Sequence, residues 1–370
     1  MKKLLLVTSV VLFAFTTSIY GQPPSGYYNS AEGKTGYTLK TALYNIIKNH
    51  QDQGYSALWE FYKTGDILPA NLTNSGTSTN RIWDIYSYNP NGQNPYEYIK
   101  GSDQCGNYNG EGSCYNREHT FPKSWFNNAA PMKNDVVHIL PTDGYTNGRR
   151  SNYPYSEVGS TTWVSQNGSR LGSSNVSGFS GTAFEPIDEF KGDLARVYFY
   201  MATRYENVIA NWENNSSNAD VVLDGTRDHV YEQWYLDLMV KWSNEDPVSD
   251  KELNRNNKIY NFQHNRNPFV DHPEYITLIW VDPTAVINPL ELKLSIYPNP
   301  VVNELHVSYS SDEPLTYFIV NMSGQKVESG VLHGRQNNIE VNQYRNGLYL
   351  IVVKSKDGKQ VKQFKFLKAS

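Results

Sequence analysis

The sequence predicts an α+β protein, with a mainly helical domain built around a short β-hairpin and helix, followed by a small C-terminal β-sandwich. Two observations predict this fold class. Apolar residues recur at helical spacing in several segments before residue 280, as in helices that pack on a core. From Leu294 onward, short β-branched and aromatic runs alternate with turn residues, as in antiparallel strands.

The chain begins with a predicted signal peptide. Lys2 and Lys3 precede an apolar run that is too short to span a membrane, and small and polar residues follow up to Gly21. We therefore expect an exported protein. The predicted segments are the signal peptide at 1–21, the main domain at 22–281, a proline-containing linker at 282–293 and the sandwich at 294–370.

Three helices can be placed in the main domain. Thr38 is predicted to cap the first helix, and Ser249 with Glu252 forms a capping box before the third. These apolar stripes indicate core packing rather than cofactor binding. The stripes are Leu39, Leu43, Ile46 and Ile47 in the first helix, and Phe190, Leu194, Val197, Tyr198, Met201 and Tyr205 in the second.

The most informative segment lies between these helices. The runs 115–125 and 143–154 bring together a carboxylate, a histidine, an amide and several cations. Hydrolysis of a phosphodiester needs a base for water, a hard cation for the phosphate oxygens and positive groups that hold the substrate. His119 can act as the base, while Glu118 and Asn147 offer the oxygen ligands that Mg²⁺ prefers. The cations in these runs include Arg117, Lys123, Arg149 and Arg150.

The local geometry sets a condition on this site. If residues 116–120 are extended, Glu118 and His119 point to opposite faces of the strand. A bulge, or a strand end near Pro122, would relieve this. We expect a twisted hairpin whose partner strand is 136–140, followed by a short helix or turn that carries Asn147.

With these motifs, the chain resembles the endonuclease I family of secreted and periplasmic bacterial nucleases, in the ββα-metal (His-Me finger) group. The resemblance covers roughly residues 35–280. Besides the two runs above, it includes Phe184-Glu185-Pro186, the segments 188–193 and 195–205, and Asn265-Arg266-Asn267-Pro268-Phe269 with the residues up to Glu274.

The resemblance implies a role for each site residue. His119 would be the general base, and Glu118 with Asn147 would hold one Mg²⁺, for which Mn²⁺ or Ca²⁺ can substitute in binding. Arg149 and Arg150 fall where contacts to substrate phosphate are expected, and Arg117 and Lys123 lie nearby. The implied activity is a largely non-specific, Mg²⁺-dependent endonuclease that leaves 5′-phosphate ends on DNA or RNA.

Two alternatives remain open at this point. One is an extracellular ribonuclease of the same family, and the other is a non-catalytic surface module for polysaccharide or matrix, since tyrosine, asparagine, serine and glycine are abundant. Charge also weighs against nucleic acid, because residues 22–290 carry 21 Lys/Arg and 30 Asp/Glu, a net charge of −9. Binding would require the basic groups to gather into a local positive groove.

The two cysteines, Cys105 and Cys114, are predicted to pair, because the protein is expected to be exported. The bond would close a small glycine- and asparagine-rich loop just before the motif. A pair of buried thiols is the alternative. The cysteine number and spacing do not fit a thiolate zinc site.

The tail resembles the C-terminal sorting domains of the type IX secretion system. The resemblance rests on Ser295-Ile296-Tyr297-Pro298-Asn299-Pro300, Asn321-Met322-Ser323-Gly324-Gln325, Asn346-Gly347-Leu348-Tyr349 and the lysine-ended last strand. It implies the type IX machinery as a partner, and a secreted or outer-membrane surface location reached through the periplasm. A plain adhesive β-module is the alternative. Strands are expected at 305–309, 315–320, 339–341, 348–353 and 363–367.

Overall fold

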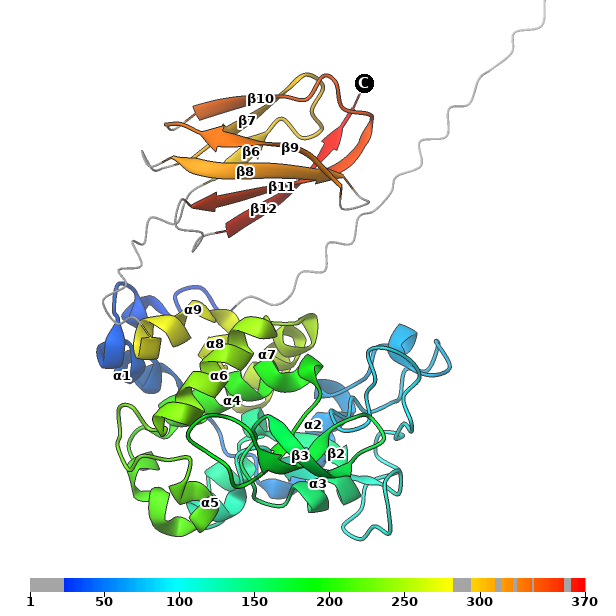
Figure 1. The fold of residues 1–370 in the computed structure, drawn as a ribbon, viewed down its shortest axis with the longest axis vertical. Coiled ribbons are helices and arrows are strands. Elements are labelled where there is room, and N and C mark those ends of the chain that lie inside the picture. The colour runs from blue at the N-terminus through cyan, green and yellow to red at the C-terminus, as the bar shows by residue number, and fades with distance from the viewer. Residues whose placement is uncertain are drawn as a thin grey trace, which may run out of the picture. The chain divides into compact units, whose positions relative to one another are not determined.

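The computed structural model describes residues 23–281, 294–309, 314–321, 325–334, 336–355 and 361–369. The predicted signal peptide at 1–21 and linker at 282–293 lie outside these residues. Residue contacts divide the chain into two compact units, Met1–Ala285 and Val286–Ser370. Mixed helix and sheet in the first unit and an all-β second unit agree with the predicted fold class (Figure 1).

The α-helices are the main regular secondary structure of the first unit (Figure 1). They are α1 (Gly36–Ile47), α2 (Leu58–Gly65), α3 (Gly144–Arg150), α4 (Lys191–Arg204), α5 (Ser217–Asp220), α6 (Gln233–Glu245), α7 (Asp250–Gln263), α8 (Pro268–Asp271) and α9 (Glu274–Ile276). Two antiparallel sheets accompany them. One pairs β1 (Tyr115–His119) with β2 (Ile139–Asp143), and the other has the order β3 (Val158–Val164), β4 (Arg170–Ser174), β5 (Thr182–Glu185).

Helix α4 forms the centre of this unit. Every residue from Gly192 to Arg204 is buried, and the helix contacts α1, α6 and α8. The predicted apolar stripe was therefore too narrow, since neighbouring elements cover all sides of the helix. None of the described helices has both the length and the apolar character needed to cross a membrane.

The predicted helix starts had different outcomes. The capping box of Ser249 and Glu252 is present at the start of α7. In α1, however, Thr35 occupies the cap position, and the Thr38 hydroxyl donates to the Thr35 carbonyl from within the first turn. A serine or threonine hydroxyl can accept from a backbone amide as a helix cap or donate to a backbone carbonyl within the first turn, so Thr38 alone did not define the start of α1.

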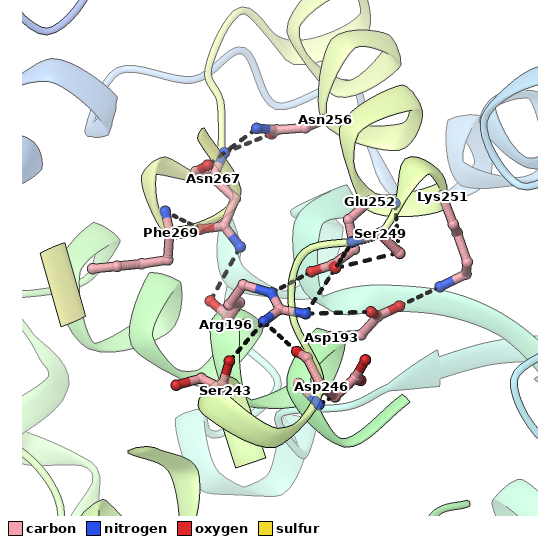
Figure 2. A network of polar contacts seen from close by, with 11 residues as sticks. Asp193, Arg196, Ser243, Asp246, Ser249, Lys251, Glu252, Asn256, Asn267 and Phe269 are labelled. Atoms are coloured by element: carbon pink, nitrogen blue, oxygen red, sulfur yellow. Dashed lines mark hydrogen bonds and ion pairs between the residues drawn. The ribbon is translucent and has the colours of Figure 1, made fainter. Parts of the chain in front are cut away.

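A buried polar network fastens α4 to α6 and α7 (Figure 2). Arg196 donates from Nε and Nη2 to the two carboxylate oxygens of Glu252, at 2.5 and 2.7 Å, and from Nη1 to the Asp246 carbonyl at 2.8 Å. The Lys251 ammonium pairs with Asp193 at 2.6 Å. The fork of Arg196 thus connects the middle of one helix to the starting turn of another.

Replacing Arg196 by methionine should therefore destabilise the protein by about 3–5 kcal/mol, because Glu252 would be left buried without its cation. Urea unfolding followed by tryptophan fluorescence would measure this change. Lys241→Met is the matched control, since Lys241 is 47% exposed in its ion pair with Glu157 and should contribute only about 0–1 kcal/mol. Equal losses in the two variants would contradict a special role for the buried pair.

The second unit is a sandwich of two antiparallel sheets. One has the order β10 (Gln336–Glu340), β7 (Glu304–Ser308), β6 (Ser295–Tyr297), and the other β12 (Val361–Lys368), β11 (Gly347–Ser355), β8 (Leu315–Asn321), β9 (Lys326–Leu332). Both sheets contribute to one apolar core, which includes Leu305, Ile319 and Phe366. The sequence prediction missed β6 and β9. Both are edge strands, and β9 is largely exposed and polar, so its side chains show no apolar run.

Candidate active site

The site is built on a strand–strand–helix unit. Strand β1 pairs with β2 in an unbroken antiparallel register, from Tyr115 opposite Asp143 to His119 opposite Ile139. Helix α3 begins directly after β2, and the Asp143 carboxylate caps it by accepting from the Thr146 amide at 2.6 Å. The helix is thereby held against the strand that carries Glu118 and His119.

The predicted partner strand at 136–140 was wrong by three residues. Residues Val136–His138 form a 3₁₀ turn instead, and β2 begins at Ile139. The Arg255 guanidinium donates to the carbonyls of Val136, Val137 and Ile139, and the Asp135 carboxylate accepts from the Val137 amide. These side-chain hydrogen bonds satisfy backbone groups that would otherwise pair with a neighbouring strand. The apolar pattern of residues 136–140 gives no sign of them.

Glu118 and His119 do point to opposite faces of β1, because the register contains no bulge. His119 is the last residue of β1, but this strand end does not bring its side chain to the face that carries Glu118. The Glu118 side faces α3, where Arg150 lies, and the His119 side faces Tyr55, Phe126 and His138.

His119 is held as a neutral imidazole. Its Nε2 lies 3.1 Å from the Lys133 carbonyl oxygen, and its ring stacks on Tyr55 with centroids 5.8 Å apart. Burial, together with the neighbouring His138, lowers the pKa of His119 well below 6.5. A carbonyl only accepts, so Nε2 carries the proton and Nδ1 keeps its lone pair. That is the tautomer a general base needs.

Glu118 is oriented through one of its two oxygens. Its Oε1 accepts from the hydroxyls of Tyr86 and Tyr155, at 3.2 and 3.3 Å, and pairs with Arg150 Nη1 at 3.1 Å. Burial raises the pKa of Glu118 to about 7, and the charge of Arg150 opposes that rise. The protein contacts found among the described residues leave Oε2 to accept a further ligand.

Asn147 is oriented in the same way. From α3 its Nδ2 donates to Asn116 Oδ1 at 2.6 Å, so the Asn147 carbonyl oxygen remains an acceptor. Asn116 lies two residues before Glu118 and therefore on the same face of β1. Arg150, one turn after Asn147 on α3, contacts Glu118. One carboxylate oxygen and one amide oxygen are thus presented by facing sides of β1 and α3.

This donor set fits a hard cation. Oxygen ligands suit Mg²⁺, which keeps several waters and often takes only one or two protein groups. No group of three or more histidine, cysteine, aspartate or glutamate side chains capable of holding a metal occurs among the described residues. A sparse site of Glu118 and Asn147 would not require one.

The predicted site residues other than the cysteines do not share one surface. Arg150 is fully buried and also donates to the carbonyls of His119 and Thr120, at 3.0 and 2.6 Å. The structure therefore does not support its predicted phosphate contact. Because Arg150 lies next to Glu118, its positive charge instead compensates the negative charge of this buried carboxylate.

Of the other predicted cations, two are exposed and Arg117 is half-buried. Arg149 is exposed on α3 above the Trp163 ring, and Lys123 is exposed after β1. Arg117 lies over Tyr55 at 3.6 Å, and Lys133 lies over the same ring at 5.2 Å. Since Tyr55 stacks on His119, two cations border the candidate base.

Sequence reasoning missed the two tyrosines that hold Glu118. Tyr86 and Tyr155 lie 32 and 37 residues from Glu118 and also bond each other at 2.8 Å. They reach it only through the tertiary fold, and nothing in the sequence around them distinguishes them from the other tyrosines of the chain.

Cys105 and Cys114 form the predicted disulfide. The loop that they close carries Tyr108, whose ring lies against α3. A Cβ added at Gly144 would come within 2.7 Å of Tyr108 Cδ1, and one at Gly148 would clash with its hydroxyl oxygen. A side chain at either position would displace the Tyr108 ring, so the two glycines allow this ring to pack closely against α3. The disulfide-closed loop therefore supports the helix that presents Asn147.

Replacing both Cys105 and Cys114 by serine should lower stability by about 2–3 kcal/mol, from the chain entropy that the loop closure removes. If the loop positions α3, the double variant should also need more metal for half-maximal activity. Urea unfolding and metal titration would measure the two effects. Gly148→Ala tests the packing separately, since it leaves the disulfide intact, and an unchanged metal requirement in both variants would contradict this role of the loop.

Comparison with known proteins places both parts of the chain. Residues 35–274 match the family model of endonuclease I, and residues 295–366 match that of a secretion system C-terminal sorting domain. An extracellular ribonuclease of Bacillus amyloliquefaciens is 34% identical over 275 residues, covering 73% of this chain and 84% of that protein. An extracellular ribonuclease of Bacillus subtilis is 33% identical over 259 residues, covering 69% of this chain and 78% of that protein.

A more distant relative is named endonuclease-1, from Buchnera aphidicola, at 27% identity over 143 residues, covering 39% of this chain and 48% of that protein. The sorting domain and the extracellular relatives indicate a secreted or cell-surface protein, as predicted. The family match confirms the resemblance read from the motifs. The chain is a nuclease of the endonuclease I family with a C-terminal secretion sorting domain.

Proposed function

We propose that this chain is a largely non-specific endonuclease that uses one Mg²⁺ to hydrolyse phosphodiester bonds of DNA and RNA, leaving 5′-phosphate ends. The observation that carries this proposal is the neutral His119 at the end of β1, which follows Glu118 in the sequence, together with the oxygens that Glu118 and Asn147 keep free of protein partners. In this proposal β1, β2 and α3 form a ββα-metal finger.

In the proposed reaction His119 acts as the general base. Its Nδ1 accepts a proton from the attacking water, while the Lys133 carbonyl keeps Nε2–H in place and orients the ring. Glu118 Oε2 and Asn147 Oδ1 would hold the cation. When bound, Mg²⁺ would supply Lewis-acid stabilisation of charge on the phosphate and leaving oxygens, and Mn²⁺ or Ca²⁺, with similar oxygen preference, would substitute in binding.

Substrate binding is assigned to the predicted cations other than Arg150. Arg149, Arg117 and Lys123 would contact backbone phosphates, with Lys133 beside them. Such contacts make affinity fall steeply with salt, since each releases counterions from the nucleic acid. Arg150 is assigned instead to positioning Glu118.

Export is proposed in two steps. The predicted signal peptide at 1–21 would direct the chain to the periplasm, and the domain at 294–370 would then engage the type IX machinery. Between these two export signals lie the proposed nuclease domain at 22–281 and the linker at 282–293.

A preference for RNA is the second candidate function. The two Bacillus relatives that cover more than two thirds of this chain are both named extracellular ribonucleases. Because the base and metal ligands act on the phosphodiester rather than on the sugar, the site chemistry serves either polymer.

The test is to incubate the full chain with supercoiled plasmid DNA and with RNA, each with Mg²⁺ or EDTA. We expect cleavage only with the metal. Asn147→Ala should raise the Mg²⁺ concentration for half-maximal activity by at least about tenfold, and Asn147→Asp should restore much of the loss by supplying another oxygen. Undiminished cleavage in EDTA, or no cleavage of either polymer by folded protein, would refute the proposal.

A further inference from the structure

A cavity of about 570 Å³ lies beside the candidate active site and is not used by the reaction described above. Its wall is formed by the end of α1, the segment from Phe126 to Met132, the end of α4 and the turns that follow α4. Its volume falls in the range of small-molecule sites. The charge of its lining, its aromatic and amide groups and its position each bear on which ligand it could take.

The charge of the lining favours an anion. The lining residues include Lys48 and Arg204 and no aspartate or glutamate. This contrasts with the rest of the main domain, since residues 22–290 carry a net charge of −9. A cationic lining on an acidic protein marks a local preference for negative ligands.

Arg204 is the buried polar group of this cavity. Its side chain is 7% exposed, and its Nε donates to His50 Nδ1 at 2.9 Å. Among the described residues it has no carboxylate partner within ion-pair distance. The nearby Asp135 accepts hydrogen bonds from Tyr200, Tyr205 and Gln263 instead. The terminal amino groups of Arg204 are therefore suited to a phosphate, which guanidinium binds in a forked geometry.

The apolar part of the lining includes four aromatic residues. Trp212 packs on Phe126 and on Tyr205, with ring centroids 5.7 Å apart in both pairs, and the partly exposed Tyr44 lines the cavity as well. The exposed amides of Asn49, Asn207 and Asn211 also belong to the lining. Phe126, Tyr205 and Trp212 are buried, so Tyr44 is the aromatic residue of the lining whose face a nucleobase can stack on, and amides can bond base edges. Aromatic, amide and guanidinium groups together fit a nucleotide.

The cavity shares a wall with the candidate base. Phe126 lines the cavity, and its ring centroid lies 6.3 Å from that of His119. Met132 also lines it, its carbonyl accepts from His138 Nε2 at 2.6 Å, and the next carbonyl, that of Lys133, holds His119. A ligand in the cavity and the His119 ring would therefore contact opposite sides of the segment that contains Phe126 and Met132.

We propose that this cavity binds an unpaired nucleotide of the substrate strand, with the base on the Tyr44 ring and its phosphate at Arg204. This inference rests on the proposed nuclease function and extends it. A base stacked in a duplex cannot enter such a cavity without leaving its partner, so single-stranded substrate gains a contact that duplex lacks. The enzyme should thus favour single-stranded or locally unpaired nucleic acid.

The first test compares Tyr44→Ala with Tyr37→Ala, a matched control on the same helix whose exposed side chain is outside the cavity. For Tyr44→Ala the ratio of kcat/KM on a single-stranded oligonucleotide to that on the corresponding duplex should fall about tenfold, mainly through KM. Tyr37→Ala should keep the wild-type ratio. An unchanged ratio in Tyr44→Ala would overturn the inference while leaving the nuclease function intact.

The second test separates the cavity from catalysis. Adenosine 5′-monophosphate, adenosine and inorganic phosphate are titrated in EDTA, with tryptophan fluorescence as the readout because Trp212 lines the cavity. The nucleotide should bind more tightly than either part. Arg204→Gln should weaken the nucleotide about tenfold or more and leave adenosine unchanged, a pattern that general unfolding would not produce. Binding without nuclease activity would overturn only the proposed function, and no nucleotide binding would overturn the cavity assignment.

Discussion

Replacing His119 by alanine should reduce kcat by about 10²–10⁴-fold on every nucleic acid substrate, because proton transfer from water loses its acceptor. The neutral state of the ring strengthens this expectation, since burial and His138 keep the pKa of His119 well below 6.5. The base is then available throughout the neutral range, and activity limited by it should fall only at more acidic pH. Steady-state kinetics with saturating Mg²⁺ would measure the loss.

The matched control for this variant is His272→Ala. His272 lies in the same unit, 35% exposed, with its ring on Tyr275 and its Nδ1 at Glu274. It should retain wild-type kcat. Circular dichroism would establish that both variants fold. If folded His119→Ala kept more than about a tenth of the activity, the general base would have to be another group.

Arg150→Met should lower both the stability of the protein and its affinity for the metal more than any other substitution in the candidate site. Glu118 would remain buried with only tyrosine hydroxyls as partners, so its pKa would rise further above about 7 and its carboxylate would be protonated at neutral pH. We expect a stability loss of about 3–5 kcal/mol and a metal requirement raised by about 10–100-fold. Urea unfolding and Mg²⁺ titration of activity would measure these effects.

Arg149→Met is the control that the chain itself offers, one residue earlier on α3. Arg149 is exposed above Trp163, so its loss should change stability by no more than about 0.5 kcal/mol. Its predicted effect is a weaker salt dependence of substrate binding. If Arg150 contacted phosphate instead, Arg150→Met would behave like Arg149→Met, with higher KM and nearly unchanged stability.

Most of the candidate site could be predicted from local sequence. The run around Glu118 and His119 indicates the strand, and the run around Asn147 indicates the short helix or turn that follows the hairpin. The loop closed by Cys105 and Cys114 follows from the expected export of the chain. Short motifs depend on residues that are close in the sequence, and the disulfide depends on export, which the predicted signal peptide indicates.

The environment of these residues could not be predicted in the same way. Arg149 and Arg150 are adjacent and chemically identical, yet one is exposed and the other is buried against Glu118. Only the packing of α3 on β1 distinguishes them, because successive helical residues point about 100° apart and just one can face the strand.

Residue types and their order are thus enough to place this chain in its fold class, its family and its secretion route, since each depends on short patterns. Long-range contacts set the properties on which activity depends. Tyr86 and Tyr155 orient Glu118 from positions 32 and 37 residues away, and Lys133 selects the tautomer of His119. Burial and hydrogen bonding shift protonation only after folding has brought these groups together, so no local pattern contains that information.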